Sequence, residues 1–314
     1  MSTASTPAST PAPTAPMLPT RRRRSGPARR QPIGYLFIAP FLVVFAVFQV
    51  FALVAALGLS FTNSHGTAGG RWVGLSNYTA LFTDPNFLLA LWHTGLLWLL
   101  TVPVLSLGGL GLAFLLNSPL ARLAKLLRTL IFLPTMPSLV VVGTLFLLLL
   151  DPTEGLPARA LHAVGLPAID IRVDAAAAIP VLAAMVLWRW LGYNMVIHLA
   201  ALQNLPREVF ESAALDGASR WRVFWQIVVP MSRPMLLFTT VISTIGIAGL
   251  FDEPFVLFGL SAGPSQGGLV LGTLMYREGF QYFNLGYASA ITYVLAIIVF
   301  VFSLIQMRVT RDER

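Results

Sequence analysis

Six long apolar runs dominate this sequence and leave few folds open to it. A helix needs roughly 20 mostly apolar residues to cross the hydrocarbon core of a bilayer. Each run reaches that length, so we predict an all-α, polytopic membrane protein with six transmembrane helices. The predicted spans cover about residues 35–59, 88–116, 128–150, 175–202, 232–256 and 286–307.

The composition of the 314 residues supports a membrane protein. Hydrophobic residues make up 56% and charged residues 11%, whereas a soluble domain carries about 25% charged residues. The net charge of +8 could indicate a nucleic-acid ligand, but the basic residues precede the first run or lie in short loops. That distribution is typical of charges that orient a membrane protein, so we expect no nucleic-acid partner.

The basic residues also predict the orientation. Most of them lie in the N-terminal tail, in the segments after the second and fourth runs, and after the last run. The opposite side holds Arg71, Arg159, Arg172 and Arg277. Cytoplasmic loops carry an excess of lysine and arginine. Both termini are therefore predicted to be cytoplasmic, which agrees with an even number of spans.

Three parts are predicted along the chain. Residues 1–34 combine a Ser/Thr/Pro/Ala tract with arginines, which predicts a disordered basic cytoplasmic tail that could bind anionic membrane lipid. Residues 35–308 form the transmembrane domain, and 309–314 form a short cytoplasmic tail. The first run exceeds the 7–15 apolar residues of a signal peptide, so it should remain as a helix.

A charged segment, "ESAALDGASRWRVFWQIVVP" (Glu211–Pro230), lies between the fourth and fifth runs. Pro206 suits the first turn of a helix. Gly217 should break this helix, Ser219 should cap a second one, and Pro230 should end it. Small residues and apolar residues recur at helical spacing on the two helices: Phe210, Ala213, Ala214 and Gly217 on the first, and Trp221, Phe224, Trp225 and Val228 on the second. The pattern predicts a cytoplasmic helix–turn–helix, either a docking element or an interfacial connector.

The spacing within this segment resembles the "EAA" signature of ABC-importer membrane subunits. In that family the loop forms coupling helices that dock in a cleft on a cytoplasmic ATPase subunit. Here Ser212 stands at the first alanine and Val229 at the leucine of the signature. The resemblance implies a coupling loop over 203–230. Its implied ATPase-coupling residues are Glu211, Ser212, Ala213, Ala214, Asp216, Gly217, Ile227 and Pro230.

Other blocks are similar to carbohydrate-uptake permeases of the maltose/glycerol-phosphate type. They include "YLFIAPFL", "WVGLSNYTALF" and "LRTLIFLPTMPS". The family commonly has T-x-G-G-P where this chain has Ser261–Pro264. The resemblance implies a bacterial or archaeal inner-membrane location and three partners: a second homologous permease, a cytoplasmic ABC ATPase dimer and an extracytoplasmic solute-binding protein.

No ATP site is expected in this chain itself. A P-loop needs G-x-x-x-x-G-K-[ST], and the only lysine, Lys125, has no glycine around it. No cofactor is therefore expected here, and ATP would be bound by the partner ATPase subunits. The four histidines (His65, His93, His162 and His198) have no metal-ligand spacing, so no metal site is predicted.

Arg189, between Trp188 and Trp190, lies inside the fourth predicted span. An ionisable residue within a span is a candidate functional residue, and we group it with Trp188, Tyr193, Asn194, Asp252 and Glu253 as substrate-path candidates. The alternative is structural. Arg189 could pair with Asp252 or Glu253, or these carboxylates could be solvated at a helix end.

The leading hypothesis is a permease subunit of an ABC importer for a sugar, and not an enzyme. The alternative is an ion- or proton-coupled secondary transporter, a class that often shows inverted repeats and charged relays within its spans. An intramembrane enzyme is a third class. It lacks a catalytic set here, because the G-x-S-x-G match at Gly259–Gly263 falls where a span emerges.

Overall fold

The computed structural model describes residues 32–66, 69–117, 121–165, 170 and 173–311. Most of the predicted N-terminal tail and residues 312–314 of the C-terminal tail lie outside the described residues. The chain divides into two units, Met1–Ala52 and Leu53–Arg314. The regular structure of the described residues is helical, with two isolated β-bridges, Thr62 with Trp72 and His65 with Asn284. The all-α prediction is confirmed for them.

The first unit contains α1 (Pro32–Phe45) and the π-helical turn η1 (Ala46–Val50), which continues into α2 (Phe51–Ser60) across the division between the units. Four described stretches are long and apolar enough to cross a membrane, and the number rises to six if two bent helix pairs each count as one span. The four are Phe37–Ser60, Pro85–Leu116, Ala175–Leu202 and Leu285–Arg308. A polytopic membrane protein is confirmed, and a count of six remains a prediction.

The two bent pairs correct the predicted third and fifth spans. In the third, α6 (Ala121–Phe132) and the 3₁₀ turn η3 (Leu133–Thr135) meet α7 (Leu139–Leu149) at 97°. Pro134 and Pro137 lie at this bend, where they remove backbone donors from the helix. The predicted run 128–150 is therefore not one straight helix.

In the fifth, the preceding segment is bent by 74° against α13 (Arg233–Ala248). The last residue of this helix is Ala248, eight residues before the predicted end at 256, and Gly249 is its C-cap. A separate helix, α14 (Asp252–Phe258), follows after Phe251, whose φ of −124° is non-helical. The predicted continuous helix over 232–256 is wrong near its C-terminal end.

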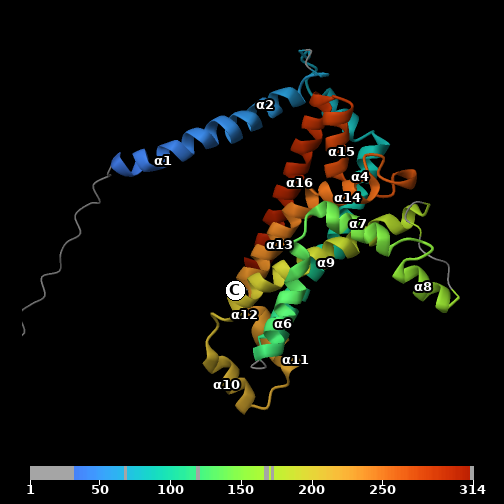
Figure 1. The fold of residues 1–314 in the computed structure, drawn as a ribbon. Coiled ribbons are helices and arrows are strands. Elements are labelled where there is room, and N and C mark those ends of the chain that lie inside the picture. The colour runs from blue at the N-terminus through green and yellow to red at the C-terminus, as the bar shows by residue number, and fades with distance from the viewer. Residues whose placement is uncertain (1–31, 67–68, 118–120, 166–169, 171–172, 312–314) are drawn as a thin grey trace, which may run out of the picture. The chain divides into compact units, whose positions relative to one another are not determined.

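The core of the second unit is built around α9 (Ala175–Leu202), whose bounds match the predicted fourth span. Around it pack α4 (Pro85–Pro103), the π-helical turn η2 (Val104–Gly108), α5 (Gly109–Leu116) and α13 (Figure 1). Gly192 of α9 faces the backbone of α6, where a Cβ would lie 2.1 Å from the carbonyl oxygen of Ile131. A residue without a side chain is what permits this close approach.

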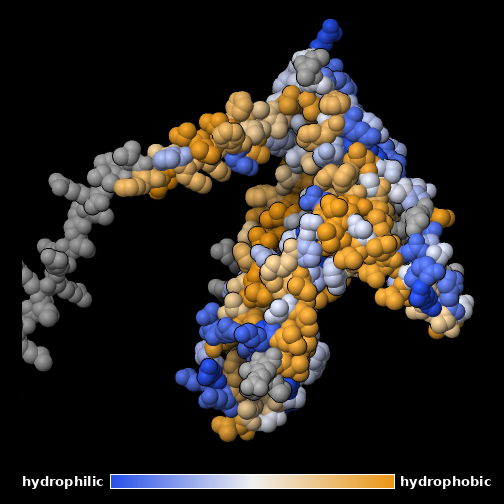
Figure 2. Space-filling view, viewed as in Figure 1, coloured by the Kyte–Doolittle hydropathy of each residue, from blue (hydrophilic) through white to orange (hydrophobic). Residues whose placement is uncertain are grey.

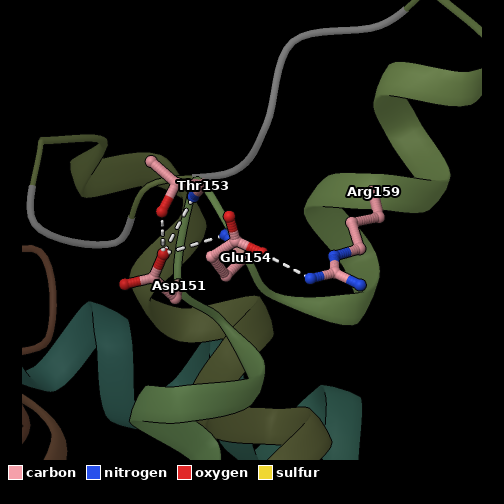
Figure 3. A network of polar contacts seen from close by, with 4 residues as sticks. All are labelled: Asp151, Thr153, Glu154 and Arg159. Atoms are coloured by element: carbon pink, nitrogen blue, oxygen red, sulfur yellow. Dashed lines mark hydrogen bonds and ion pairs between the residues drawn. The ribbon is translucent and has the colours of Figure 1, made fainter.

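Further elements also belong to this unit. They are α3 (Ser76–Leu81), α8 (Leu156–Ala163), the 3₁₀ turn η5 (Pro264–Gln266), α15 (Leu271–Tyr276), the π-helical turn η6 (Arg277–Gln281) and the long helix α16 (Leu285–Arg311). Between α7 and α8, Asp151 Oδ1 accepts hydrogen bonds from the backbone and hydroxyl of Thr153 and from the backbone of Glu154, which itself pairs with Arg159 (Figure 3). This exposed ion pair adds little stability, since surface pairs contribute about 0–1 kcal/mol.

Candidate functional site: a helical turn and a cavity joined by two helices

The charged segment folds as the predicted helix–turn–helix. The first helix is α10 (Arg207–Leu215), with Pro206 at its N-cap, one position before the predicted first turn. Gly217 has φ +66°, its N–H donates to the carbonyl of Ala214, and the N–H of Ala218 donates to that of Ala213. This pair of hydrogen bonds is a Schellman motif, which ends a helix with a left-handed residue, most often glycine.

The second helix begins where Ser219 was predicted to cap it, because its hydroxyl accepts from the backbone of Arg222. It comprises α11 (Arg220–Val223), the π-helical turn η4 (Phe224–Val228) and α12 (Val229–Met231). Pro230 lies inside α12 and does not end the helix, which stops at Ser232. The predicted apolar side is divided, since Phe224 and Val228 are buried while Trp221 and Trp225 are exposed.

The exposed face of α10 differs from the predicted one. Ala213 is buried, and Phe210 packs against the core cluster that includes Leu202 and Phe224. These two members of the predicted small-residue face therefore point into the protein. The exposed members of the signature are Glu211, Ser212, Ala214, Asp216 and Gly217, whereas Ile227 and Pro230 are half-buried. Figure 2 shows hydrophilic residues gathered over α10.

One exposed residue of α10 had no signal in the sequence. Leu215 is 90% exposed at the end of the helix, beside Asp216 and the turn at Gly217. Its side chain is therefore accessible to a partner protein. The hydroxyl of Ser212, which stands at an alanine position of the signature, donates to the carbonyl of Glu208 in its own helix.

A cavity of about 540 Å³ lies between α9, α13 and α14. Five of the six predicted substrate-path residues line it: Arg189, Tyr193, Asn194, Asp252 and Glu253. Trp188 does not, since its ring packs against Phe146 at a centroid distance of 5.6 Å. The cavity is also lined by residues that the sequence analysis did not place there: Trp190 on α9, and Phe238, Thr239, Ile242, Ser243 and Gly246 on α13.

A buried ion pair joins two walls of this cavity. The Nη1 of Arg189 lies 2.9 Å from Oε1 of Glu253, and the indole N–H of Trp190 donates to the same oxygen at 3.1 Å. Glu253 is 3% exposed and the Arg189 side chain 16% exposed. Arg189 also lies over the Trp190 ring. The predicted pairing of Arg189 with Glu253 is present, whereas Asp252 is exposed.

The helix–turn–helix lies between two helices of the chain that both line the cavity. Arg189, Tyr193 and Asn194 lie on α9, which leads directly into the loop that carries α10. That loop leads through α11, η4 and α12 into α13, which supplies Phe238 and Gly246 to the opposite wall. The loop that carries α10 therefore connects two helices that line the cavity. No cluster of metal-ligating side chains occurs in the described parts of the chain.

Comparison with known families agrees with this arrangement. The model for the binding-protein-dependent transport system inner membrane component family matches residues 106–312, which include the helix–turn–helix and, apart from Leu105, the residues that line the cavity. The chain belongs to this family. It is accordingly a multi-pass membrane permease and not an enzyme, and in this family ATP is used by separate subunits.

Relatives of this permease match it over nearly the whole chain. The lactose transport system permease protein LacF of Rhizobium radiobacter is 35% identical over 90% of this chain and 95% of its own length. The arabinooligosaccharides transport system permease protein AraP of Bacillus subtilis is 34% identical, over 88% of each chain. A solved permease chain of a bacterial alginate ABC transporter, in complex with an alginate-bound periplasmic protein, has a TM-score of 0.78 at 23% identity, covering 90% of this chain and 95% of its own. At this level of identity, the similarity concerns the fold alone.

Proposed function

We propose that this permease carries a sugar across the membrane through the cavity between α9, α13 and α14, and that α10 and α11 receive the work of ATP hydrolysis from a cytoplasmic ATPase. Its partners would be a second homologous permease, an ABC ATPase dimer and an extracytoplasmic solute-binding protein. Both termini and the loop 203–230 would be cytoplasmic. The loop matches the coupling signature, and the basic residues beside it favour that side.

The observation that carries the proposal is the connection between the two features. The loop 203–232 joins the C-terminal end of α9 to the N-terminal end of α13, and these helices form facing walls of the cavity. Rigid helices transmit a displacement along their length, and closely packed elements switch between discrete arrangements. An ATPase that moves α10 would change the width of the cavity.

The chemistry of the cavity supports a sugar as the transported solute. Ligand sites combine apolar and aromatic walls with a few polar groups. Here Trp190, Phe238 and Phe251 supply aromatic surface, while Tyr193 and Asn194 supply hydrogen-bonding groups. The relatives LacF and AraP are named for lactose and arabinooligosaccharides, which belong to the same chemical class.

The test uses the complete transporter, purified with its native partner subunits and reconstituted in vesicles. Sugar uptake should require ATP on the side of α10. Replacing Leu215 with asparagine should weaken ATPase binding about tenfold or more, as for a central interface residue. Leu156→Asn, a second exposed leucine on the short helix α8, is the matched control and should leave ATPase binding unchanged. Uptake driven by an ion gradient without ATP would instead establish a secondary transporter.

A further inference from the structure

We infer that the cavity selects uncharged sugars over acidic ones. The reason is that Glu253 forms an ion pair with Arg189, which would otherwise bind the carboxylate or sulfonate group of an acidic sugar. The inference rests on the proposed function, since it concerns the solute carried through the same cavity. Among the described residues that line the cavity, the charged ones are Arg189, Asp252 and Glu253. This cluster of one cation and two carboxylates has an excess of negative charge.

Arg189 is the natural anion-binding group of this cavity. A guanidinium presents a planar fork of donors that matches a carboxylate or a sulfonate. Here the positive charge is already balanced, because Nη1 donates to Glu253 and the group lies over the Trp190 ring, while the buried Nε has no hydrogen-bond partner among the described residues. An anionic solute would have to compete with a carboxylate that belongs to the protein.

Glu253 cannot easily give way to such a solute. It is 3% exposed, and its Oε1 accepts from Arg189 and from the indole of Trp190. Separating the pair would leave a buried charge without its partner, which is strongly unfavourable. The exposed carboxylate of Asp252, one residue earlier and also lining the cavity, would further repel a negatively charged sugar.

The remaining polar groups suit a neutral polyhydroxy compound. Tyr193, Asn194 and Ser243 line the same cavity and can exchange hydrogen bonds with hydroxyl groups as both donors and acceptors. None of these three groups carries the positive charge that would attract an acidic sugar. The cavity therefore offers hydrogen bonds to either class of sugar but a free counter-ion to neither.

The experiment measures binding to the assembled transporter in detergent by calorimetry. The probes are a set of neutral di- and trisaccharides, each paired with the uronate of the same size and linkage. In the unaltered transporter the uronates should bind at least about tenfold more weakly, the equivalent of one charge-assisted interaction. Glu253→Gln should free Arg189 and improve uronate binding relative to the neutral sugar by about tenfold.

Two further variants make the result specific. Arg189→Gln combined with Glu253→Gln should lose the gain in uronate binding, because the freed cation is then absent. Glu278→Gln makes the same chemical change outside the cavity, at a carboxylate that accepts from Asn284, and should leave the preference unchanged. If Glu253→Gln fails to assemble, the unaltered transporter still decides, since equal binding of neutral and acidic sugars there overturns the inference.

Failure of this inference differs from failure of the proposed function. Tight uronate binding by the unaltered transporter, or an unchanged preference in a folded Glu253→Gln variant, would overturn the selectivity while leaving sugar transport intact. Absence of binding by every sugar, together with absence of ATP-dependent sugar uptake, would overturn the proposed function itself.

Discussion

The imidazole Nε2 of His198 lies 3.2 Å from the hydroxyl of Thr239, and this contact joins α9 to α13 inside the protein. His198 is 0% exposed, so it is a packing residue of the bundle. One residue further along α13, Thr240 donates to Ser106 of η2 at 3.0 Å. The first of these contacts joins two helices that line the cavity, and the second joins α13 to η2.

The His198–Thr239 contact should be measurable as a coupling energy. Polar contacts between membrane helices average about 0.6 kcal/mol and reach about 1.7 kcal/mol. In a double-mutant cycle, His198→Leu and Thr239→Val should therefore be non-additive by about 0.5–1.5 kcal/mol, measured from unfolding in mixed micelles. Combining His198→Leu with Thr292→Val is the control, because the Thr292 hydroxyl donates within its own helix. Additive effects in the first pair would contradict the coupling.

Gly217 should matter for its backbone conformation and its location together. Its φ of +66° is left-handed, and a Cβ there would meet nothing within 4 Å. Gly217→Ala should therefore cost about 1–2 kcal/mol of local backbone strain without a clash, and should lower the sugar transported per ATP hydrolysed.

Gly165 provides the matched control for this prediction. It has φ +76° with equally open space around its Cβ position, but it follows α8 and lies outside the coupling loop. Gly165→Ala should carry the same strain and keep the transport stoichiometry of the unaltered protein. An equal loss of coupling in both variants would show that strain alone is responsible.

Variants of Arg189 and Glu253 separate a structural pair from a substrate path. Arg189→Leu leaves Glu253 buried and without its cation, which should destabilise the protein by about 3–5 kcal/mol. Replacing both residues with leucine should recover most of that stability in a thermal unfolding measurement. It should not recover uptake, because two apolar side chains then replace the charged pair that lines the substrate path. Full uptake by the double variant would mean that the pair is structural only.

Gly192 should be sensitive to a single added methyl group. Its Cβ position lies 2.1 Å from the carbonyl oxygen of Ile131 and 2.8 Å from Cα of Phe132, both of which are backbone atoms. Gly192→Ala should separate α9 from α6 and lower stability by about 1–3 kcal/mol. Gly95→Ala, on α4 with open space around its Cβ position, should be neutral or slightly stabilising. Equal melting temperatures for the two variants would contradict the close approach.

Local signals in the sequence were sufficient for much of the fold. The length of the apolar run predicted α9 to the residue, and the serine and glycine at positions 219 and 217 predicted a cap and a helix end that the structure contains. These features depend on a few neighbouring residues. Chain length, side-chain capping and left-handed φ are properties of a short segment, so a sequence can state them.

The direction in which each side chain points was harder to predict. A span that is apolar on all sides has no polar face to show which side packs against the protein. Trp188 and Trp190 look alike in the sequence, yet they point about 200° apart on one helix. Trp190 bonds Glu253 in the cavity while Trp188 packs against Phe146. For the same reason, the sequence did not indicate that Phe238 and Gly246 of α13 line the cavity. It also did not show that Ala213, on the predicted exposed face of α10, is buried.

The sequence by itself determined that the chain is a helical membrane protein, that one of its spans covers α9, and that a charged helix–turn–helix separates two of the apolar runs. Only the tertiary structure decided that α13 ends at Ala248, so that α14 turns and brings Glu253 to Arg189 from 64 residues away. The physical reason is that helix formation depends on local backbone hydrogen bonds, whereas an ion pair between distant residues depends on how whole helices pack.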